Sequence, residues 1–243
     1  MKRNLRVRLA AEFLGTAFLV CAVVGSGIMA ERLAGGNVAL ALLANTIATG
    51  AALVALILTF GPISGAHFNP AVSIGDALEG GLTWSDATAY MGAQCSGGVL
   101  GTLLAHVMFG LQLVTISRHV RSGPAQAVSE FVAAFGLLCV IWGCSRTRST
   151  VTPFAVSAYI VGAYWFTAST SFANPAVTIA RSLSDTFAGI RPADVPVFIV
   201  AQLLGAIAAT FLFRWMIPSL SLSAKDVVVG KEVPEEEYSR AVS

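Results

Sequence analysis

The chain has 243 residues, of which 56% are hydrophobic and 12% are charged, and its formal net charge is +2. Because soluble domains usually carry about a quarter charged residues, this composition is a poor match for a soluble enzyme, a nucleic-acid-binding protein or a disordered chain. Six spans of about 20 residues with their connections would use most of the length. We therefore expect a polytopic protein of the lipid bilayer with no nucleic-acid partner.

The apolar residues gather in six long segments and two short ones. The long segments lie near residues 9–30, 38–60, 87–113, 127–145, 153–171 and 195–217. The short ones, near 69–79 and 174–184, begin with Asn-Pro and cannot cross a bilayer, because about 20 residues are needed. The sequence thus predicts an all-α membrane protein with one domain over 1–218. The stretch 219–243 contains three consecutive glutamates and is expected to be a cytoplasmic tail.

Lysine and arginine are unevenly divided between the two sides of the expected membrane domain. If the N-terminus is cytoplasmic, ten of the 15 lie inside, and the five outside are Arg32, Arg118, Arg121, Arg181 and Arg191. Cytoplasmic connections of membrane proteins carry the excess of these residues. We therefore expect a multi-pass cell-membrane protein with both termini in the cytoplasm, and the short loops favour a bacterial inner membrane.

Three features occur twice in the same order: an acid in a long span, Asn-Pro-Ala before a short segment, and a glutamine in the next long span. The first set is Glu12, Asn69-Pro70-Ala71 and Gln94, and the second is Glu130, Asn174-Pro175-Ala176 and Gln202. Since each copy holds three spans, an odd number, the two copies must have opposite orientations in the membrane. The pattern predicts an inverted three-plus-three repeat, with half-repeats near 9–113 and 127–217 and two half-membrane re-entrant helices that meet near the midplane.

Each Asn-Pro pair is typical of a helix start. Asn is a preferred N-cap and Pro is favoured at the first helical position, so Asn69 and Asn174 should cap the two short helices. Irregular backbone at that depth is tolerated only beside protein or a water-filled cavity. With each Asn oxygen capping its own helix, the amide N–H groups are expected to be free to donate to a passing solute. Both positive helix ends would point at the centre, which disfavours cations and a proton chain.

The residues before each short helix offer backbone carbonyl groups to the same path. We expect Gly65, Ala66 and His67 to line it on one side, and Phe172 and Ala173 on the other. Donors at the centre with acceptors on both sides suit small neutral hydroxylated solutes. His67 is expected to hold its loop rather than bind a metal, because no second ligand lies at a useful spacing. Neither a metal nor a cofactor is expected.

Glu12 and Glu130 are the two acids deep inside long apolar spans. An intramembrane acid is by default a functional-site hypothesis, and a proton relay is one such role. Their matched positions favour a supporting role instead, in which each carboxylate accepts hydrogen bonds from the N–H groups of the pore loops. A proton-coupled or ion-conducting transporter that uses these two acids remains the alternative.

These residues resemble those of the aquaporin, or major intrinsic protein, family over nearly the whole chain, from residue 10 to residue 218. The resemblance rests on segments 64–72 and 174–176 together with Glu12 and Glu130. It implies a right-handed bundle of six spans and two half-helices that acts as a passive channel rather than an enzyme. It also implies one pore per subunit and a homotetramer.

The family's narrowest point is an outer filter of four side chains, which usually includes aromatic residues and an arginine. Counting from the two loop asparagines places this selectivity filter at Thr49, Gly162, Ser171 and Val177. The family's arginine would stand at Val177, so all four residues are small or medium in size and uncharged. Loss of an aromatic ring and of a fixed charge should widen the constriction and relax discrimination against anions and larger polar solutes. Strict selectivity for water is therefore not expected.

Two charged residues lie further along the short segments. Arg181 follows Val177 by four residues and so shares its helix face, from which it could replace the missing charge. Asp76 occupies the matching position after Asn69 and is expected to shape the cytoplasmic mouth. Thr178 stands where glycerol facilitators of the family have an Asp, which weakens a plain glycerol assignment.

Some bacterial members of the family that are associated with arsenic resistance also lack the filter arginine. By this resemblance we favour passage of neutral metalloid hydroxides such as arsenite, with methylated arsenicals, water and polyols as further solutes. Arsenite is neutral at pH 7 and presents hydroxyl groups, which fits a pore of amide donors and carbonyl acceptors. A structural membrane protein with a closed pore is a third hypothesis, which impermeability to every solute would support.

Overall fold

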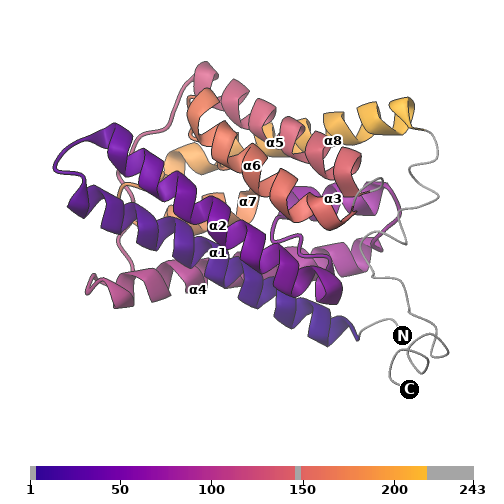
Figure 1. Cartoon of the computed structure of the whole chain (residues 1–243), viewed down its shortest axis with the longest axis horizontal. Coiled ribbons are helices and arrows are strands. Elements are labelled where there is room, and N and C mark those ends of the chain that lie inside the picture. Colours follow the sequence, from indigo (N-terminus) through magenta and orange to yellow (C-terminus); the bar gives the residue numbers. More distant parts are fainter. Residues whose placement is uncertain (1–3, 146–148, 218–243) are drawn as a thin grey trace.

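The computed structural model describes residues 4–145 and 149–217, and within these ranges it contains eight α-helices and no β-strand (Figure 1). The six long helices are α1 (Leu5–Leu33), α2 (Val38–Ser64), α4 (Trp84–Met108), α5 (Pro124–Ser145), α6 (Thr152–Phe166) and α8 (Val195–Met216). The two short ones are α3 (Pro70–Leu78) and α7 (Pro175–Arg181). The predicted all-α fold of six spans and two re-entrant helices is confirmed, whereas the expected tail, 219–243, lies outside the described residues.

Four helices are long and apolar enough to cross a bilayer by length and composition: α1, α2, α5 and the segment that contains α8. α6 has 15 residues and is shorter than a helix that crosses a bilayer alone, whereas α4 has 25 residues but a lower mean hydropathy over its most apolar stretch than the other four. The polar side chains of α4 that lower its hydropathy, among them Gln94, Thr102 and His106, are buried inside the bundle. α4 therefore directs its polar surface toward the protein and leaves residues such as Val107 exposed, as a lipid-facing helix requires.

The two halves of the chain pack in the same way. α1 lies along α2 and α4, and α5 lies along α8 and α6. Where α1 crosses α4, Gly97 lies against the backbone of Phe13, and where α5 crosses α8, Gly205 lies against the backbone of Phe131. A Cβ atom at either glycine would collide with that backbone, so the small residue permits the close approach of the helices.

The short helices bring the two halves together. α3 packs against α4 of its own half and α8 of the other, and α7 packs against α8 and α4 in the reciprocal way. α7 accordingly lies in the middle of the bundle in Figure 1. Each short helix is capped as predicted, because the Oδ1 atoms of Asn69 and Asn174 accept hydrogen bonds from the backbone N–H groups of Ala71 (2.9 Å) and Ala176 (3.0 Å).

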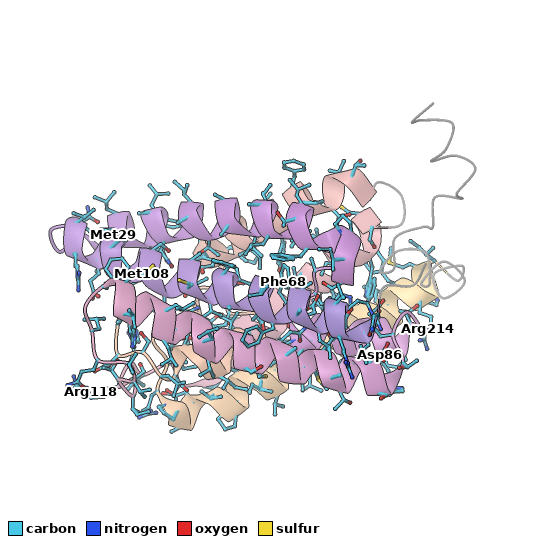
Figure 2. All side chains as sticks on the ribbon, turned by 90° about the horizontal axis from the view of Figure 1, so that it is seen from below. Met29, Phe68, Asp86, Met108, Arg118 and Arg214 are labelled. Carbon is cyan, nitrogen blue, oxygen red and sulfur yellow. The ribbon has the colours of Figure 1, made fainter. Side chains whose placement is uncertain are left out.

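The bundle has two ends that differ in their residues. Figure 2 shows Met29, Met108 and Arg118 toward one end, which we call the loop face. Asp86 and Arg214 lie toward the other end, which we call the N-terminal face because Arg8 near the start of α1 pairs with Asp86 there (2.5 Å). Phe68, from the loop before α3, lies between the two ends in the same view.

The fifth span ends earlier than the sequence predicts. α6 stops at Phe166 rather than near residue 171, and the chain continues as a loop to Asn174. Thr170 and Ser171 in this loop have φ values of +61° and +50°, outside the helical region. No Gly or Pro interrupts the sequence between Phe166 and Asn174, so the usual signal of a helix end was missing.

We expect Gly97→Leu to destabilise the protein by ~1–3 kcal/mol or more, because an added side chain must separate the backbones of α1 and α4. The measurement is the thermal unfolding midpoint of the detergent-solubilised protein. Gly92→Leu, on the same helix, is the control, since Gly92 is exposed and a Cβ atom there meets nothing within 4 Å. An equal midpoint for both variants would contradict this account of the crossing.

Candidate functional site

A cavity of about 790 Å³ lies inside the bundle and is lined by six of the helices and by both loops that precede the short helices. Toward the N-terminal face its wall includes Ser145 and Thr152, and toward the loop face it includes Thr49 and Tyr164. The expected loop residues Gly65, Ala66, His67, Phe172 and Ala173 all line it. The two half-repeats therefore enclose one internal space between them.

Asn69 and Asn174 meet at the centre of this cavity. The Nδ2 atom of Asn69 donates to the carbonyl oxygen of Ala173 (2.8 Å), and Nδ2 of Asn174 donates to that of Phe68 (2.7 Å). Each amide thus bonds to the residue that precedes the other asparagine. This corrects the expectation that both amide N–H groups are free, because one of the two on each side chain is used to join the half-repeats. Among the residues that the structure describes, the second N–H of each amide has no partner, and both asparagines line the cavity.

The carboxylate of Glu12 organises the first loop. Its Oε1 accepts hydrogen bonds from Ser64 Oγ (2.6 Å) and His67 N (3.0 Å), and its Oε2 accepts from Phe68 N (2.7 Å) and Gln94 Nε2 (2.8 Å). Glu12 is fully buried and does not line the cavity. The acid is therefore placed to satisfy backbone donors that apolar surroundings would otherwise leave unpaired.

Glu130 repeats this arrangement in the second half. Oε1 accepts from Phe172 N (2.9 Å), while Oε2 accepts from Ala173 N (2.9 Å) and Gln202 Nε2 (2.5 Å). Gln202 also donates to Thr178 Oγ1 (2.9 Å), so the residue that departs from the glycerol facilitator pattern belongs to this buried network. Gln94 and Gln202, which occupy matched positions in the two halves, thus connect each carboxylate to its short helix.

Both loops are held in a conformation that their residue types disfavour. Every non-glycine residue with positive φ in the described chain lies in one of them: Ala66, Phe68, Thr170, Ser171 and Ala173. Such conformations cost ~1–3 kcal/mol each, and they persist only where surrounding contacts impose them. The carboxylate bonds supply those contacts, and they turn the loop N–H groups toward Glu12 and Glu130 rather than toward the cavity.

His67 is fixed inside the first loop. Its Nδ1 lies 3.0 Å from Ser73 Oγ, and its ring meets the edge of Tyr90 at a centroid distance of 5.5 Å. The equivalent pair in the second half is Phe172 and Phe198, whose centroids are 5.2 Å apart. Across residues 4–145 and 149–217, no group of three or more His, Cys, Asp or Glu side chains could hold a metal ion.

Three of the four expected filter residues line the cavity: Thr49, Ser171 and Val177. Gly162 does not, because it is exposed on the outside of α6, and Tyr164 faces the cavity in its place. Gly162 and Tyr164 are two positions apart and so point about 200° apart around the helix axis. An error of two residues in a count back from Asn174 therefore selects the opposite face of α6. The Tyr164 hydroxyl lies 3.4 Å from Thr49 Oγ1, which adds an aromatic side chain that the sequence count missed.

Arg181 and Asp76 also line the cavity, one from each short helix. Arg181 is 2% exposed, and its guanidinium lies over the ring of Phe172, with Cζ 3.4 Å from the ring centroid. Asp76 is buried toward the N-terminal face. Their equal spacing after Asn174 and Asn69 was visible in the sequence, whereas their access to the same cavity was not.

Arg121 is a functional candidate that the sequence did not single out. It lies in the connection between α4 and α5, and its Nε donates to the carbonyl oxygen of Gly189 (2.8 Å). Nη1 donates to the carbonyl oxygen of Ser169 (3.1 Å), and the backbone N–H donates to Asp194 Oδ2 (2.8 Å). This side chain therefore ties three connections of the loop face together, and no local pattern marks such a role.

Comparison with known proteins agrees with this geometry. The family described as "Major intrinsic protein" matches residues 2–170 and 147–239. Aquaglyceroporin AqpS of Rhizobium meliloti (strain 1021) is 57% identical over 214 residues, which are 88% of this chain and 91% of that protein. A glycerol uptake facilitator protein of Streptococcus pneumoniae is 33% identical over 179 residues, which are 63% of this chain and 72% of the facilitator.

The fold is also shared with a solved structure. The X-ray structure of the aquaglyceroporin from Plasmodium falciparum superposes with a TM-score of 0.67 at 22% identity, and the match covers 90% of this chain and 100% of that one. At this identity the likeness concerns the fold alone, but the family match and the AqpS relative extend over most of the sequence. The chain therefore belongs to the major intrinsic protein family of passive membrane channels and is not an enzyme.

Proposed function

We propose that this channel conducts small uncharged solutes that carry hydroxyl groups, with metalloid hydroxides such as arsenite, polyols and water among them. The observation that carries the proposal is the cavity wall at Thr49, Ser171 and Val177, where the side chains are small or medium in size and uncharged and lie at the level of the uncharged Tyr164. An arginine at Val177 would occupy more of the path and add a charge. The names of the Rhizobium aquaglyceroporin and the Streptococcus glycerol facilitator support a path for solutes larger than water. Methylated arsenicals belong to the same class when they are uncharged.

The polar groups along the cavity suit solutes of this kind. Asn69 and Asn174 each keep an amide N–H that can donate, and the loop residues from Gly65 to His67 can offer carbonyl oxygens. Thr49 and Ser171 carry hydroxyl groups that donate and accept. A hydroxylated solute can therefore exchange bonds to water for bonds to the wall, which offsets the cost of its dehydration.

The buried acids favour passive conduction over proton coupling. Glu12 accepts four hydrogen bonds and Glu130 accepts three, and neither residue lines the cavity. A proton relay needs a carboxylate that can exchange protons with the path. The positive ends of α3 and α7 also point toward the centre, where they disfavour cations.

We further propose a homotetramer in a bacterial inner membrane with both termini in the cytoplasm, so that the loop face lies outside. Two observations support this proposal: more Lys and Arg residues lie in the segments on the same side of the membrane as the N-terminus, and the sequence resembles the family. Large apolar side chains such as Phe18, Ile47 and Phe211 are exposed on the single chain, which suits contact with lipid or with neighbouring subunits.

We expect Val177→Arg to reduce the flux of glycerol and arsenite while water flux is retained, because a long charged side chain would narrow the cavity. The measurement is stopped-flow swelling of proteoliposomes with each solute. Val177→Leu, which adds volume without charge, is the matched control and should have a smaller effect. Unchanged glycerol flux in Val177→Arg would contradict the assigned filter level, and a wild type that passes no solute would favour the closed-pore hypothesis.

We expect Glu130→Gln to destabilise the protein. The two oxygens of the carboxylate accept from Phe172 N and Ala173 N, and the amide replaces one of these oxygens by an NH2 group that cannot accept. An unsatisfied buried donor costs ~1–3 kcal/mol, which a lower thermal midpoint would report. Glu31→Gln, at an exposed residue, should leave the midpoint unchanged.

The same variant separates the two functional hypotheses. Solute uptake by wild-type proteoliposomes should be indifferent to a pH gradient or a membrane potential. Uptake that a pH gradient drives, and that Glu130→Gln abolishes in protein that remains folded, would favour the coupled transporter instead.

A further inference from the structure

Arg181 brings a positive charge to the cavity one helical turn beyond Val177. It is the last residue of α7, and both residues line the cavity. Residues four apart share a helix face, so the guanidinium belongs to the same wall as Val177. Because α7 runs from the central Asn174 toward the loop face, Arg181 lies further from the centre than Val177 does.

Two contacts hold the guanidinium in place. Its Nε donates to the carbonyl oxygen of Ala188, and its Cζ lies 3.4 Å from the centroid of the Phe172 ring. Phe172 is itself fixed, since its N–H is bound by Glu130 (2.9 Å) and its ring meets the edge of Phe198. The position of the charge is thus set by the same network that shapes the second loop.

The terminal nitrogens of Arg181 remain available to the cavity. Among the residues that the structure describes, Nη1 and Nη2 have no hydrogen-bond partner, and no carboxylate lies within ion-pair distance of the guanidinium. A charge without an ion-pair partner, set in a wall of low dielectric constant, acts on an ion in the adjoining space. The buried carboxylate of Glu130, which acts on both Arg181 and Arg121, offsets part of this effect. The guanidinium is nevertheless free to oppose a cation and to donate hydrogen bonds to a neutral solute.

A second guanidinium strengthens this field. Arg121 lies over the same ring, with Cζ 5.0 Å from the centroid of Phe172, but it does not line the cavity. Burial lowers the pKa of Arg121 to about 10, so its side chain stays protonated at pH 7. Its guanidinium donates to the carbonyl oxygens of Gly189 and Ser169 and to the Thr170 hydroxyl (3.5 Å), and of the two cations Arg181 is the one that lines the cavity.

We propose that Arg181 determines the charge selectivity of this channel, as a filter arginine displaced by one helical turn toward the loop face. This inference rests on the proposed function and divides the filter into two levels. Thr49, Tyr164, Ser171 and Val177 limit the size of the solute, and Arg181 rejects cations where the passage has already opened. A wide pore can in this way remain closed to sodium ions and protons.

The test uses full-length protein in proteoliposomes, with sodium and proton leak measured beside water and glycerol swelling. Arg181→Met should raise the cation leak at least about tenfold, which corresponds to ~1.4 kcal/mol removed from the barrier, while glycerol flux is kept or increased. Arg181→Lys should stay tight to cations because it keeps the charge. Arg118→Met is the matched control, since Arg118 is 89% exposed and pairs with Asp185 away from the cavity.

A double variant tests the position of the charge. Val177→Arg combined with Arg181→Met moves the arginine back by one turn, so the cation leak should return to the wild-type level while glycerol flux falls. If the methionine variant does not reconstitute, Arg181→Gln keeps an N–H donor for Ala188 without the charge, and its leak must rise as well.

Three results separate the outcomes. Cation-tight Arg181→Met or Arg181→Gln protein would mean that the central helix ends suffice, and would overturn the inference. A double variant that stays leaky would also overturn it. Failure of the proposed function would show differently, as a wild type that conducts water but neither glycerol nor arsenite.

Discussion

Two buried carboxylates hold the backbone on which the rest of the pore depends. Each loop before a short helix places N–H groups inside an apolar bundle, where unpaired donors cost several kcal/mol each. Glu12 and Glu130 accept those donors from behind, and the same bonds keep non-glycine residues at positive φ. Without them neither Asn69 nor Asn174 would reach the centre in the orientation that joins the two halves.

The central asparagines serve structure and function with the same amide group. The oxygen of each caps its own short helix, and one N–H bonds across to the loop of the other half. Within the described part of the chain the other N–H has no partner, and both asparagines line the cavity. The spacing between the two short helices is therefore set by direct hydrogen bonds between the half-repeats.

The repeat is broken where the chemistry of the two halves differs. The contact between the rings of His67 and Tyr90 in the first half corresponds to the contact between Phe172 and Phe198 in the second. The guanidinium of Arg181 packs over the face of the Phe172 ring. The residue equivalent to Arg181 is Asp76, so the two sides of the cavity carry residues of opposite charge. Small residues stand at matched positions in the helix crossings of both halves, because the helices approach closely in each. The residues that line the cavity differ between the two halves.

The sequence by itself determined the membrane class, the six spans, the inverted repeat and the paired residues at its centre. These follow from hydropathy and from spacing along single helices, which are local properties. The tertiary structure decided which residues reach the cavity. The packing of α6 turns Tyr164 toward the path and leaves Gly162 exposed, and the fold around Phe172 brings Arg181 and Arg121 to one ring. Contacts between distant segments decide such placements, and no local pattern encodes them.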